Sequence, residues 1–364
     1  MKKLLWIICI FVFTIGITMW WQTNTTTDSV SQNQKNDTGI VAEIPTDPIP
    51  LEEKIGQLFI IGHWIGTPIA STTELIVKHN LGGIIIMGNA EKTTTTKEWV
   101  DTWQDASKTP LIVSVDQEGG VVTRYKQENF TQTSQREITD SKTAYETGYK
   151  RGSELKSLGI NMNFAPVLDS AKNPDSFMYE RVFKNRAESA TLAASMVKGM
   201  KAAGVTGVVK HFPGHDDTNV DSHFSLPIVD IPKNQLDDFT SPFIEIIKNN
   251  TPEAIMTAHV LFPKIDSLPA TLSKFFLTDY LRTKLGFTGV IITDDMSMNA
   301  IDSNWSSTEA SIKTIVAGAD IVLFAAEPEL VSGAIEAVKQ AVKNGGISEK
   351  RVDDSYERIM LIKQ

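Results

Sequence analysis

Short apolar runs alternate with helix-like segments along most of the chain after residue 50. The runs consist mainly of Ile, Val, Leu, Phe and Met and lack a strict apolar–polar alternation, which is typical of strands buried on both faces. Strands that alternate with helices favour a parallel sheet. The eight expected strands are Leu58–Gly62, Gly83–Met87, Leu111–Val115, Asn163–Val167, Gly207–Val209, Ala254–Ala258, Gly289–Ile292 and Ile321–Phe324.

The segments between these strands carry helical patterns, and glycine often stands just before the next strand, where a helix C-cap is needed. An α/β chain with eight such repeats fits a single (β/α)8 TIM-type barrel. A doubly wound open sheet is the alternative, but no Gly-rich phosphate-binding loop follows the first strand. The expected helices include Ala187–Ala203, Leu236–Asn249 and Glu309–Ala317, and the last expected helix is Ser348–Ile362.

The N-terminal segment differs from the rest of the chain. Lys2 and Lys3 precede an apolar run, Leu4–Trp21, which approaches the roughly 20 residues that span a bilayer and exceeds a signal h-region of roughly 7–15 residues. No A-x-A-like cleavage site follows the run. We therefore favour an uncleaved signal-anchor over residues 1–21, with a cleaved signal peptide as the alternative. Either way we expect export, with the protein membrane-anchored on the extracellular side or secreted.

Composition separates a linker from a folded domain. Residues 22–50 are rich in Thr, Asn, Gln, Ser, Asp and Pro, which predicts a disordered linker, and the folded domain is expected over residues 51–364. The only cysteine, Cys9, lies in the apolar run, so the exported part has no thiol for a disulfide or a metal site. The net charge of -9 argues against nucleic acid as a partner. We expect a monomer.

Polar groups follow five of the expected strands. The carboxyl ends of barrel strands meet on one face, where barrel enzymes have their active sites. A single polar residue there could be a cap or a structural hydrogen-bond partner, but five strands contributing together predict an active site. The residues are Asp116, Gln117 and Glu118 after the third strand, Asp169 after the fourth, Lys210 and His211 after the fifth, His259 after the sixth, and Asp294 and Asp295 after the seventh.

The segment KHFPGHDDTNVDSH, Lys210–His223, holds half of the six histidines of the chain. Lys210 and His211 stand where the hydroxyl or carbonyl groups of a ligand would lie. The spacing of His211 and His215 resembles a metal-binding pair, but such a pair needs a helix to align it, and Phe212-Pro213-Gly214 interrupts a helix. We expect His215 to shape the loop instead.

Two further residues are candidates for acid–base and nucleophilic chemistry. Asp221 and His223 point the same way in an extended loop, and a histidine oriented by a carboxylate is a competent proton shuttle; a pair that only braces the loop is the alternative. Asp294 ends a buried strand, where a fixed and partly desolvated carboxylate suits a nucleophile or electrostatic stabiliser. Capping a helix that begins near Met296 is the other possible role, and we assign it to Asp295.

These residues lie in motifs that resemble glycoside hydrolase family 3, in its β-N-acetylglucosaminidase (β-hexosaminidase) branch. The resemblance covers essentially all of residues 51–364, and five motifs in the family's order with barrel spacing make it specific. They are EKIGQLFIIG at Glu53–Gly62, VDQEGG at Val115–Gly120, NFAPVLD at Asn163–Asp169, KHFPGH…DSH at Lys210–His223 and TDDMSM at Thr293–Met298.

The resemblance implies retaining removal of terminal β-linked N-acetylglucosamine from cell-wall fragments (muropeptides) or chitooligosaccharides, without a metal ion or cofactor. It assigns Asp294 as the nucleophile and His223, oriented by Asp221, as the acid/base. It implies substrate contacts at Asp116, Arg124, Arg181, Lys210 and His211.

Two positions depart from the family pattern: Val121 stands where arginine is usual, and Asp216 where glycine is usual. Two other functions are compatible with the sequence. One is a metal-dependent barrel hydrolase that uses Asp294 and the cluster His211, His215, Asp221 and His223. The other is a wall-binding protein with a degenerate site, against which the intact Asp294, Asp221 and His223 argue.

Overall fold

The computed structural model describes residues 49–364 except 90–92, 128, 216–219, 223 and 250–251. Eight strands, each hydrogen-bonded in parallel to its neighbours, close into a barrel in the order β1 to β8. The predicted (β/α)8 barrel is therefore confirmed, and the open-sheet alternative is wrong. The strands are β1 Phe59–Trp64, β2 Gly83–Met87, β3 Ile112–Val115, β4 Met162–Asn163, β5 Thr206–Phe212, β6 Ala254–Thr257, β7 Val290–Asp295 and β8 Ile321–Phe324.

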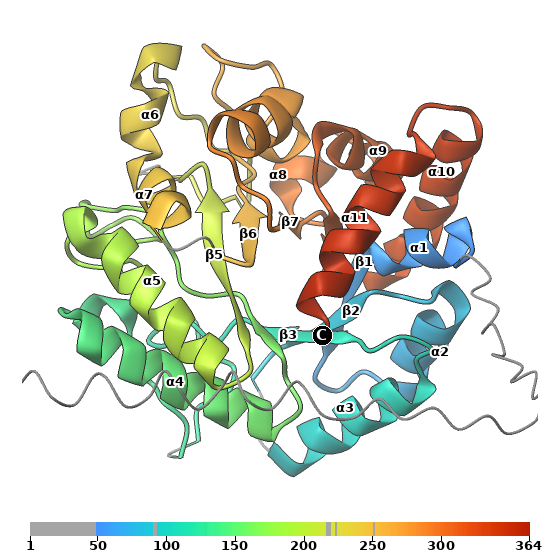
Figure 1. Cartoon of the computed structure of the whole chain (residues 1–364), viewed down its shortest axis with the longest axis horizontal. Coiled ribbons are helices and arrows are strands. Elements are labelled where there is room, and N and C mark those ends of the chain that lie inside the picture. Colours follow the sequence, from blue (N-terminus) through green and yellow to red (C-terminus); the bar gives the residue numbers. More distant parts are fainter. Residues whose placement is uncertain (1–48, 90–92, 128, 216–219, 223, 250–251) are drawn as a thin grey trace, which may run out of the picture. The chain divides into compact units, whose positions relative to one another are not determined.

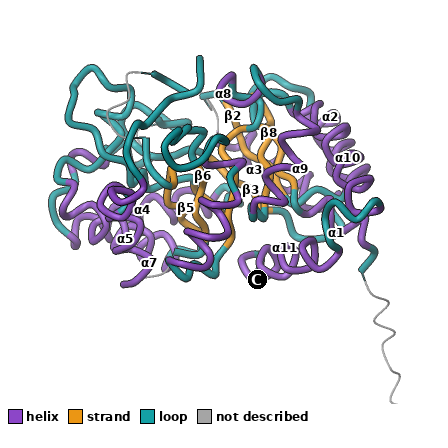
Figure 2. The backbone as a smooth tube through the Cα atoms, turned by 90° about the horizontal axis from the view of Figure 1, so that it is seen from above, coloured by secondary structure: helices purple, strands orange, loops and turns teal. Residues whose placement is uncertain are grey.

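Helices surround the strands on the outside (Figure 2), so the strands are buried on both faces, as their continuous apolar runs predict. The main helices are α1 Leu51–Gln57, α2 Ile69–His79, α3 Thr93–Ala106, α4 Ser141–Ser157, α5 Arg186–Ala202, α6 Leu236–Phe239, α7 Ser241–Asn249, α8 Asn299–Asp302, α9 Ser307–Ala317, α10 Val331–Lys343 and α11 Glu349–Ile362. Short 3₁₀ segments are η1 Gln135–Glu137, η2 Lys233–Gln235, η3 Ala270–Leu272 and η5 Pro328–Leu330, and η4 Phe275–Lys284 is a π-helix.

The predicted helix over Leu236–Asn249 is two helices, α6 and α7. Pro242 has no backbone N–H and restricts the residue before it, so one continuous helix cannot pass through this position. The backbone N–H groups of Phe243 and Ile244 instead donate to the Thr240 carbonyl, at 2.9 and 3.1 Å. The other expected helices correspond to α5, α9 and α11.

Glycine ends three helices before the next strand, as predicted. Gly159, Gly204 and Gly318 have φ angles of +82°, +80° and +127°, a backbone conformation that residues with a Cβ adopt only at a cost. These turns direct the chain from the outer helices back into the barrel.

The first and last described helices lie side by side (Figure 1). Lys54 of α1 donates to Asp353 of α11 at 2.7 Å, and Lys363 donates to the buried Gln57 at 2.6 Å. No helix within the described residues is long and apolar enough to cross a bilayer. The expected anchor, residues 1–21, and all of the expected linker except residues 49 and 50 lie outside the described residues, so both stay predictions.

A buried ion cluster fixes the amino-terminal rim of the barrel. The Asp320 side chain is fully buried just before β8. It accepts hydrogen bonds from the Ile291 backbone N–H of β7 at 2.9 Å, from Ser355 at 2.6 Å and from Arg358 at 2.7 Å, the last two on α11. Arg282 of η4 also donates to it. One carboxylate thus joins β7, β8, η4 and α11.

We expect Asp320→Asn to lower the free energy of unfolding by about 3–5 kcal/mol, because removing the anion leaves several guanidinium groups without their counter-charge. Denaturant unfolding measures this loss. Asp101→Asn is the matched control, since Asp101 forms an exposed ion pair with Lys97, and its removal should cost less than about 1 kcal/mol. Equal losses in the two variants would show that Asp320 does not hold the rim together.

Candidate active site

The carboxyl ends of β3, β5 and β7, the loops after β3 and β5, and the loop between β4 and α5 surround one pocket of about 240 Å³. Six residues predicted from the sequence as catalytic or substrate-binding line it together: Asp116, Arg124, Arg181, Lys210, His211 and Asp294. Glu118, Val121, Val122, Phe177, His215 and Ser222 complete the lining. The structure therefore brings these six predicted residues to one place.

Glu118, just beyond the end of β3, holds two cationic side chains of the pocket, Arg181 and Lys210, in place. Its carboxylate is 1% exposed and accepts a two-point interaction from Arg181, at 3.0 Å from Nε and 2.8 Å from Nη2. Lys210 Nζ of β5 lies 2.8 Å from the same carboxylate. Two-point arginine–carboxylate pairs fix geometry as well as charge. Glu118 thus sets where the two cations stand relative to each other.

The charges of this cluster stabilise one another in their ionised forms. Burial raises the pKa of Glu118, but Arg181 and Lys210 outweigh it and hold the pKa well below its usual range. Burial lowers the pKa of Lys210, but the two carboxylates beside it, Asp116 and Glu118, raise it overall. The pocket therefore presents permanent charges, which suit hydrogen bonding to the hydroxyl groups of a sugar.

Asp116 is the second carboxylate of this cluster and is more accessible than Glu118. It accepts a hydrogen bond from Lys210 at 2.6 Å, and Arg124 Nη2 lies 3.7 Å from its other oxygen. Its side chain is 17% exposed. Asp116 keeps accessible carboxylate surface towards the pocket, whereas both oxygens of Glu118 are occupied by the cations.

Asp169 holds the two histidines of the β5 loop. It accepts from the ring Nδ1 of His211 at 2.7 Å, from the His211 backbone N–H at 3.0 Å and from the His215 backbone N–H at 2.7 Å. Burial raises the pKa of Asp169, but His211 and the other groups that it contacts lower it overall. Since the ionised carboxylate only accepts, Nδ1 of His211 donates the ring hydrogen bond. The ring orientation of His211 at the pocket is thereby fixed.

Asp294 lies at the end of β7 and lines the pocket. Its Oδ1 accepts the backbone N–H of Asp295 at 2.9 Å. Burial raises the pKa of Asp294, but the neighbouring His211 and smaller contributions from other groups outweigh it and lower the pKa to about 2. Asp294 is therefore an ionised carboxylate at neutral pH, as a nucleophile requires.

Asp295 and His259 have structural roles. The expected helix near Met296 is absent at that place, and α8 begins only at Asn299, so Asp295 does not cap it as we predicted. Asp295 instead accepts the backbone N–H groups of Ala325 and Ala326, both at 2.9 Å, beyond the end of β8. The carbonyl of Asp295 in turn accepts from Nε2 of the buried His259 at 2.9 Å. These contacts fix the end of β7, and with it the neighbouring Asp294.

The predicted acid/base dyad is only partly described. Ser222, between its two members, is buried and lines the pocket. The carbonyl of Asp221 accepts the backbone N–H groups of Phe224 and Ser225, at 2.9 and 3.2 Å. His223 lies outside the described residues, so its role and its orientation by Asp221 stay predictions.

His211 and His215 are the two described histidines of the predicted metal cluster, since His223 lies outside the described residues. The rings of His211 and His215 meet edge to face, with centroids 5.4 Å apart and an interplanar angle of 89°. His211 Nδ1 is engaged by Asp169. Over the described residues, no three His, Cys, Asp or Glu side chains are grouped so as to hold a metal ion. His215 also lines the pocket, in addition to the loop-shaping role that we expected.

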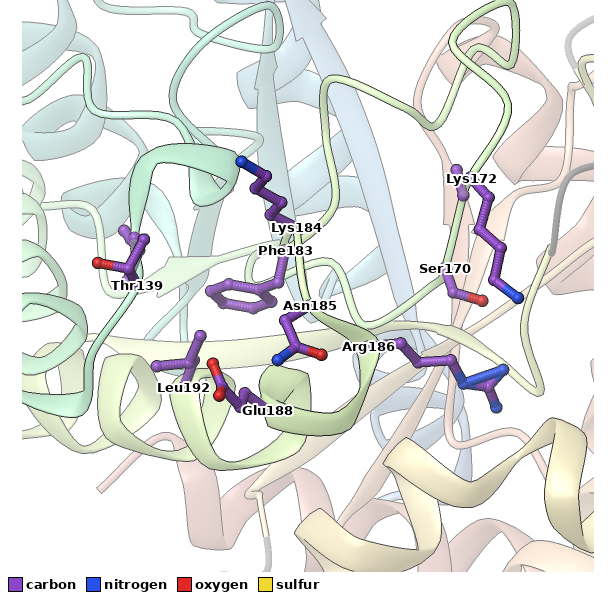
Figure 3. A pocket seen from close by; sticks show the side chains of 11 residues that line it. Thr139, Ser170, Lys172, Phe183, Lys184, Asn185, Arg186, Glu188 and Leu192 are labelled. Carbon is purple, nitrogen blue, oxygen red and sulfur yellow. The ribbon is translucent and has the colours of Figure 1, made fainter.

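A larger cavity, of about 490 Å³, lies beside the start of α5. Phe183, Ile138 and Leu192 line it, and Arg186 at its rim is engaged by the carbonyl groups of α6. Figure 3 shows Lys184 pointing away from Lys172 and Arg186. The cationic side chains of this larger cavity therefore do not converge on one ligand. None of the predicted site residues lines it.

A barrel with a charged pocket at the carboxyl ends of its strands has the architecture of a (β/α)8 enzyme. The model of the glycosyl hydrolase family 3 N-terminal domain matches residues 50–362. The chain therefore belongs to glycosyl hydrolase family 3.

Individual relatives agree. The chain is 34% identical to a β-hexosaminidase of Haemophilus influenzae over 73% of its own length and 78% of the relative's. It is 33% identical to β-hexosaminidase A of Pseudoalteromonas piscicida over 80% of its length, but spans only 54% of that protein. A solved family 3 β-N-acetylglucosaminidase from Paenibacillus sp. str. FPU-7 is 37% identical with a TM-score of 0.80, over 87% of this chain and 62% of that one. The predicted family and enzyme class are confirmed: the chain is a glycoside hydrolase related to β-hexosaminidases.

Sequence reasoning placed Glu118 and Asp169 at the rim but gave neither a role. Both carboxylates are buried. Glu118 binds cationic side chains of the pocket, and Asp169 binds a histidine that lines it. Their position after predicted strands was the available signal. Which cation each one pairs with depends on contacts between strands and loops far apart in sequence.

We expect Glu118→Gln to lower the free energy of unfolding by about 3 kcal/mol, because the buried Arg181 and Lys210 lose their shared counter-charge. Denaturant unfolding measures this. Glu98→Gln, on the exposed face of α3, is the matched control and should change stability by less than about 0.5 kcal/mol. A loss below about 1 kcal/mol in Glu118→Gln would contradict the role of Glu118 as the organising charge.

Two buried histidines make stability depend on pH. Burial lowers the pKa of His215 to about 4 and that of His63 to about 4. His63 of β1 packs edge-on against Trp99 and Trp103 and contacts Thr72 at 2.8 Å. Both are neutral in the folded protein at pH 5–7. In the unfolded chain they take up protons below about pH 6.5.

Because the unfolded state binds these protons first, we expect stability to fall as pH drops from 6.5 towards 4. The loss between pH 7 and pH 5 is about 2 kcal/mol for each of the two histidines. His63→Gln should remove its share of the pH dependence. Urea unfolding at the two pH values tests this, and an unchanged difference between them in His63→Gln would contradict it.

Proposed function

We propose that the protein is a retaining exo-β-N-acetylglucosaminidase in which Asp294 forms a glycosyl-enzyme intermediate. The observation that carries the proposal is the ionised Asp294 at the carboxyl end of β7, in a pocket whose other charges are already paired. A carboxylate held in this way suits attack on an anomeric carbon. The β-hexosaminidase names of the relatives favour an N-acetylhexosamine as the sugar.

The sugar hydroxyl groups would contact Asp116, Arg124, Arg181, Lys210 and His211, which line the pocket with Asp294. A smaller cavity of about 90 Å³ shares Asp116, Arg124 and Asp294 with the pocket. Met87 and Met298 are among its apolar lining residues. These methionine side chains, beside the proposed nucleophile, suit the methyl group of an N-acetyl substituent, and the charged lining residues suit its amide.

The reaction has two steps. In the first, protonated His223, oriented by Asp221, gives its proton to the glycosidic oxygen while Asp294 attacks the anomeric carbon, so the C–O bond to the leaving group breaks and a glycosyl ester forms. In the second, neutral His223 takes a proton from water, and the resulting hydroxide attacks the anomeric carbon. This releases the sugar, frees the Asp294 carboxylate and restores protonated His223.

We propose that the substrates are cell-wall fragments or chitooligosaccharides that carry a terminal β-linked N-acetylglucosamine. The support is the apolar N-terminal run after two lysines, which would export the domain and tether it to the membrane unless it is cleaved. Residues 22–50 would then connect the anchor to the barrel. We propose that the protein acts as a monomer.

We expect purified protein to release chromophore from an aryl β-N-acetylglucosaminide much faster than from the gluco or N-acetylgalacto analogue. Asp294→Asn should reduce kcat by at least roughly 10³-fold, whereas Asp279→Asn, an exposed ion-pair residue, should have wild-type activity. The β-anomer should appear first when the product is followed by NMR, since two displacements retain configuration.

His223→Ala should slow poor leaving groups more than activated aryl ones, because the latter need less protonation. An α-anomer as the first product would exclude the glycosyl-enzyme. Activity that a chelator abolishes would favour the metal-dependent hydrolase instead. Tight sugar binding without any hydrolysis would indicate a wall-binding protein.

A further inference from the structure

The pocket is lined by buried charged side chains in its deep part and by an exposed apolar side chain at its mouth. Of its described lining residues, Val121 alone is exposed, at 63%, so it marks the open side. The charged groups lie deeper: Lys210 is 3% exposed and Glu118 1%. A valine side chain thus stands at the entrance of an otherwise highly charged site.

Val121 is held in place by a tight turn. The Val122 carbonyl accepts the backbone N–H groups of Glu118 and Gly119, at 3.0 and 3.1 Å. Gly119 and Gly120 have φ angles of +88° and +62°, which favour glycine. Because Glu118 is itself fixed by Arg181 and Lys210, the position of Val121 follows from the ion cluster below it.

Phe177 adds a second apolar side chain to the same pocket, from the loop between β4 and α5. Its ring meets the ring of His215 edge to face, with centroids 5.5 Å apart and an interplanar angle of 89°. His215 packs in the same way against His211. Phe177 is therefore positioned by rings that belong to the site.

An isolated exposed valine on a protein surface needs no explanation. Val121 differs from such a residue because it lies at the mouth of the pocket. In an exo-acting enzyme the sugar fills the deep charged part, and the group beyond the broken bond extends through the mouth. Apolar surface on that group would leave water when it packs against Val121 and Phe177, and this burial stabilises the complex.

We propose that Val121 and Phe177 form a leaving-group site that selects aglycones with apolar surface, such as an alkyl group or the C–H face of a following sugar ring. The inference rests on the proposed function for the placement of the sugar. It assigns a specificity role to an exposed residue at the mouth of the pocket.

Binding of non-hydrolysable methyl and octyl β-thioglycosides of N-acetylglucosamine, measured by calorimetry, tests the proposal without relying on catalysis. Wild type should bind the octyl compound about tenfold more tightly, a difference of about 1.4 kcal/mol. In Val121→Ser this preference should fall about fivefold. Val77→Ser is the matched control, because Val77 is 58% exposed on α2 and does not line the pocket, and the preference should not change.

An equal preference for the octyl compound in wild type and Val121→Ser would overturn the inference, as would its absence in wild type. Failure of the proposed function looks different: the protein would bind the thioglycosides with the expected preference but would not hydrolyse the aryl glycoside. A protein that binds neither thioglycoside would contradict both.

Discussion

The site depends on one buried carboxylate. Glu118 has almost no exposure, and its two oxygens are taken by Arg181 and Lys210. Because an unpaired ion is costly in the interior, each of these groups is tolerable only beside the others. β3, β5 and the loop after β4 are therefore fixed relative to one another by charge, in addition to the barrel hydrogen bonds. The deep part of the pocket, the orientation of the cations and the turn that carries Val121 all follow from this cluster.

A second carboxylate has the same function at the neighbouring strand. Asp169 fixes the backbone and ring of His211 and the backbone of His215. Asp294 then needs only a short contact to the backbone of Asp295, which is itself held by the end of β8. Carboxylates that position other groups are saturated with donors, whereas the proposed nucleophile keeps surface towards the pocket. Carboxylate side chains of the same kind thus take different roles, according to how many hydrogen bonds each one accepts.

The apolar runs of the sequence were sufficient to predict all eight strands and the barrel, because strands buried on both faces have continuous apolar segments. The end of each strand was enough to predict which side chains meet at the rim. The roles of Glu118, Asp169 and Asp295 were not predictable, because each depends on partners from another strand or loop. The break between α6 and α7 could have been predicted from Pro242. The link between Asp221 and His223 rests on the resemblance, since His223 lies outside the described residues.

The pairing of the first and last described helices affects the order in which the barrel forms on a growing chain. β1 has β2 as a neighbour early, but its other edge is paired only when β8 has been made, and α1 gains Asp353 only with α11. The strands that supply the proposed nucleophile and its cations are complete before that point. Synthesis therefore makes the strands that carry these residues first, and the partner that closes the barrel against β1 comes last.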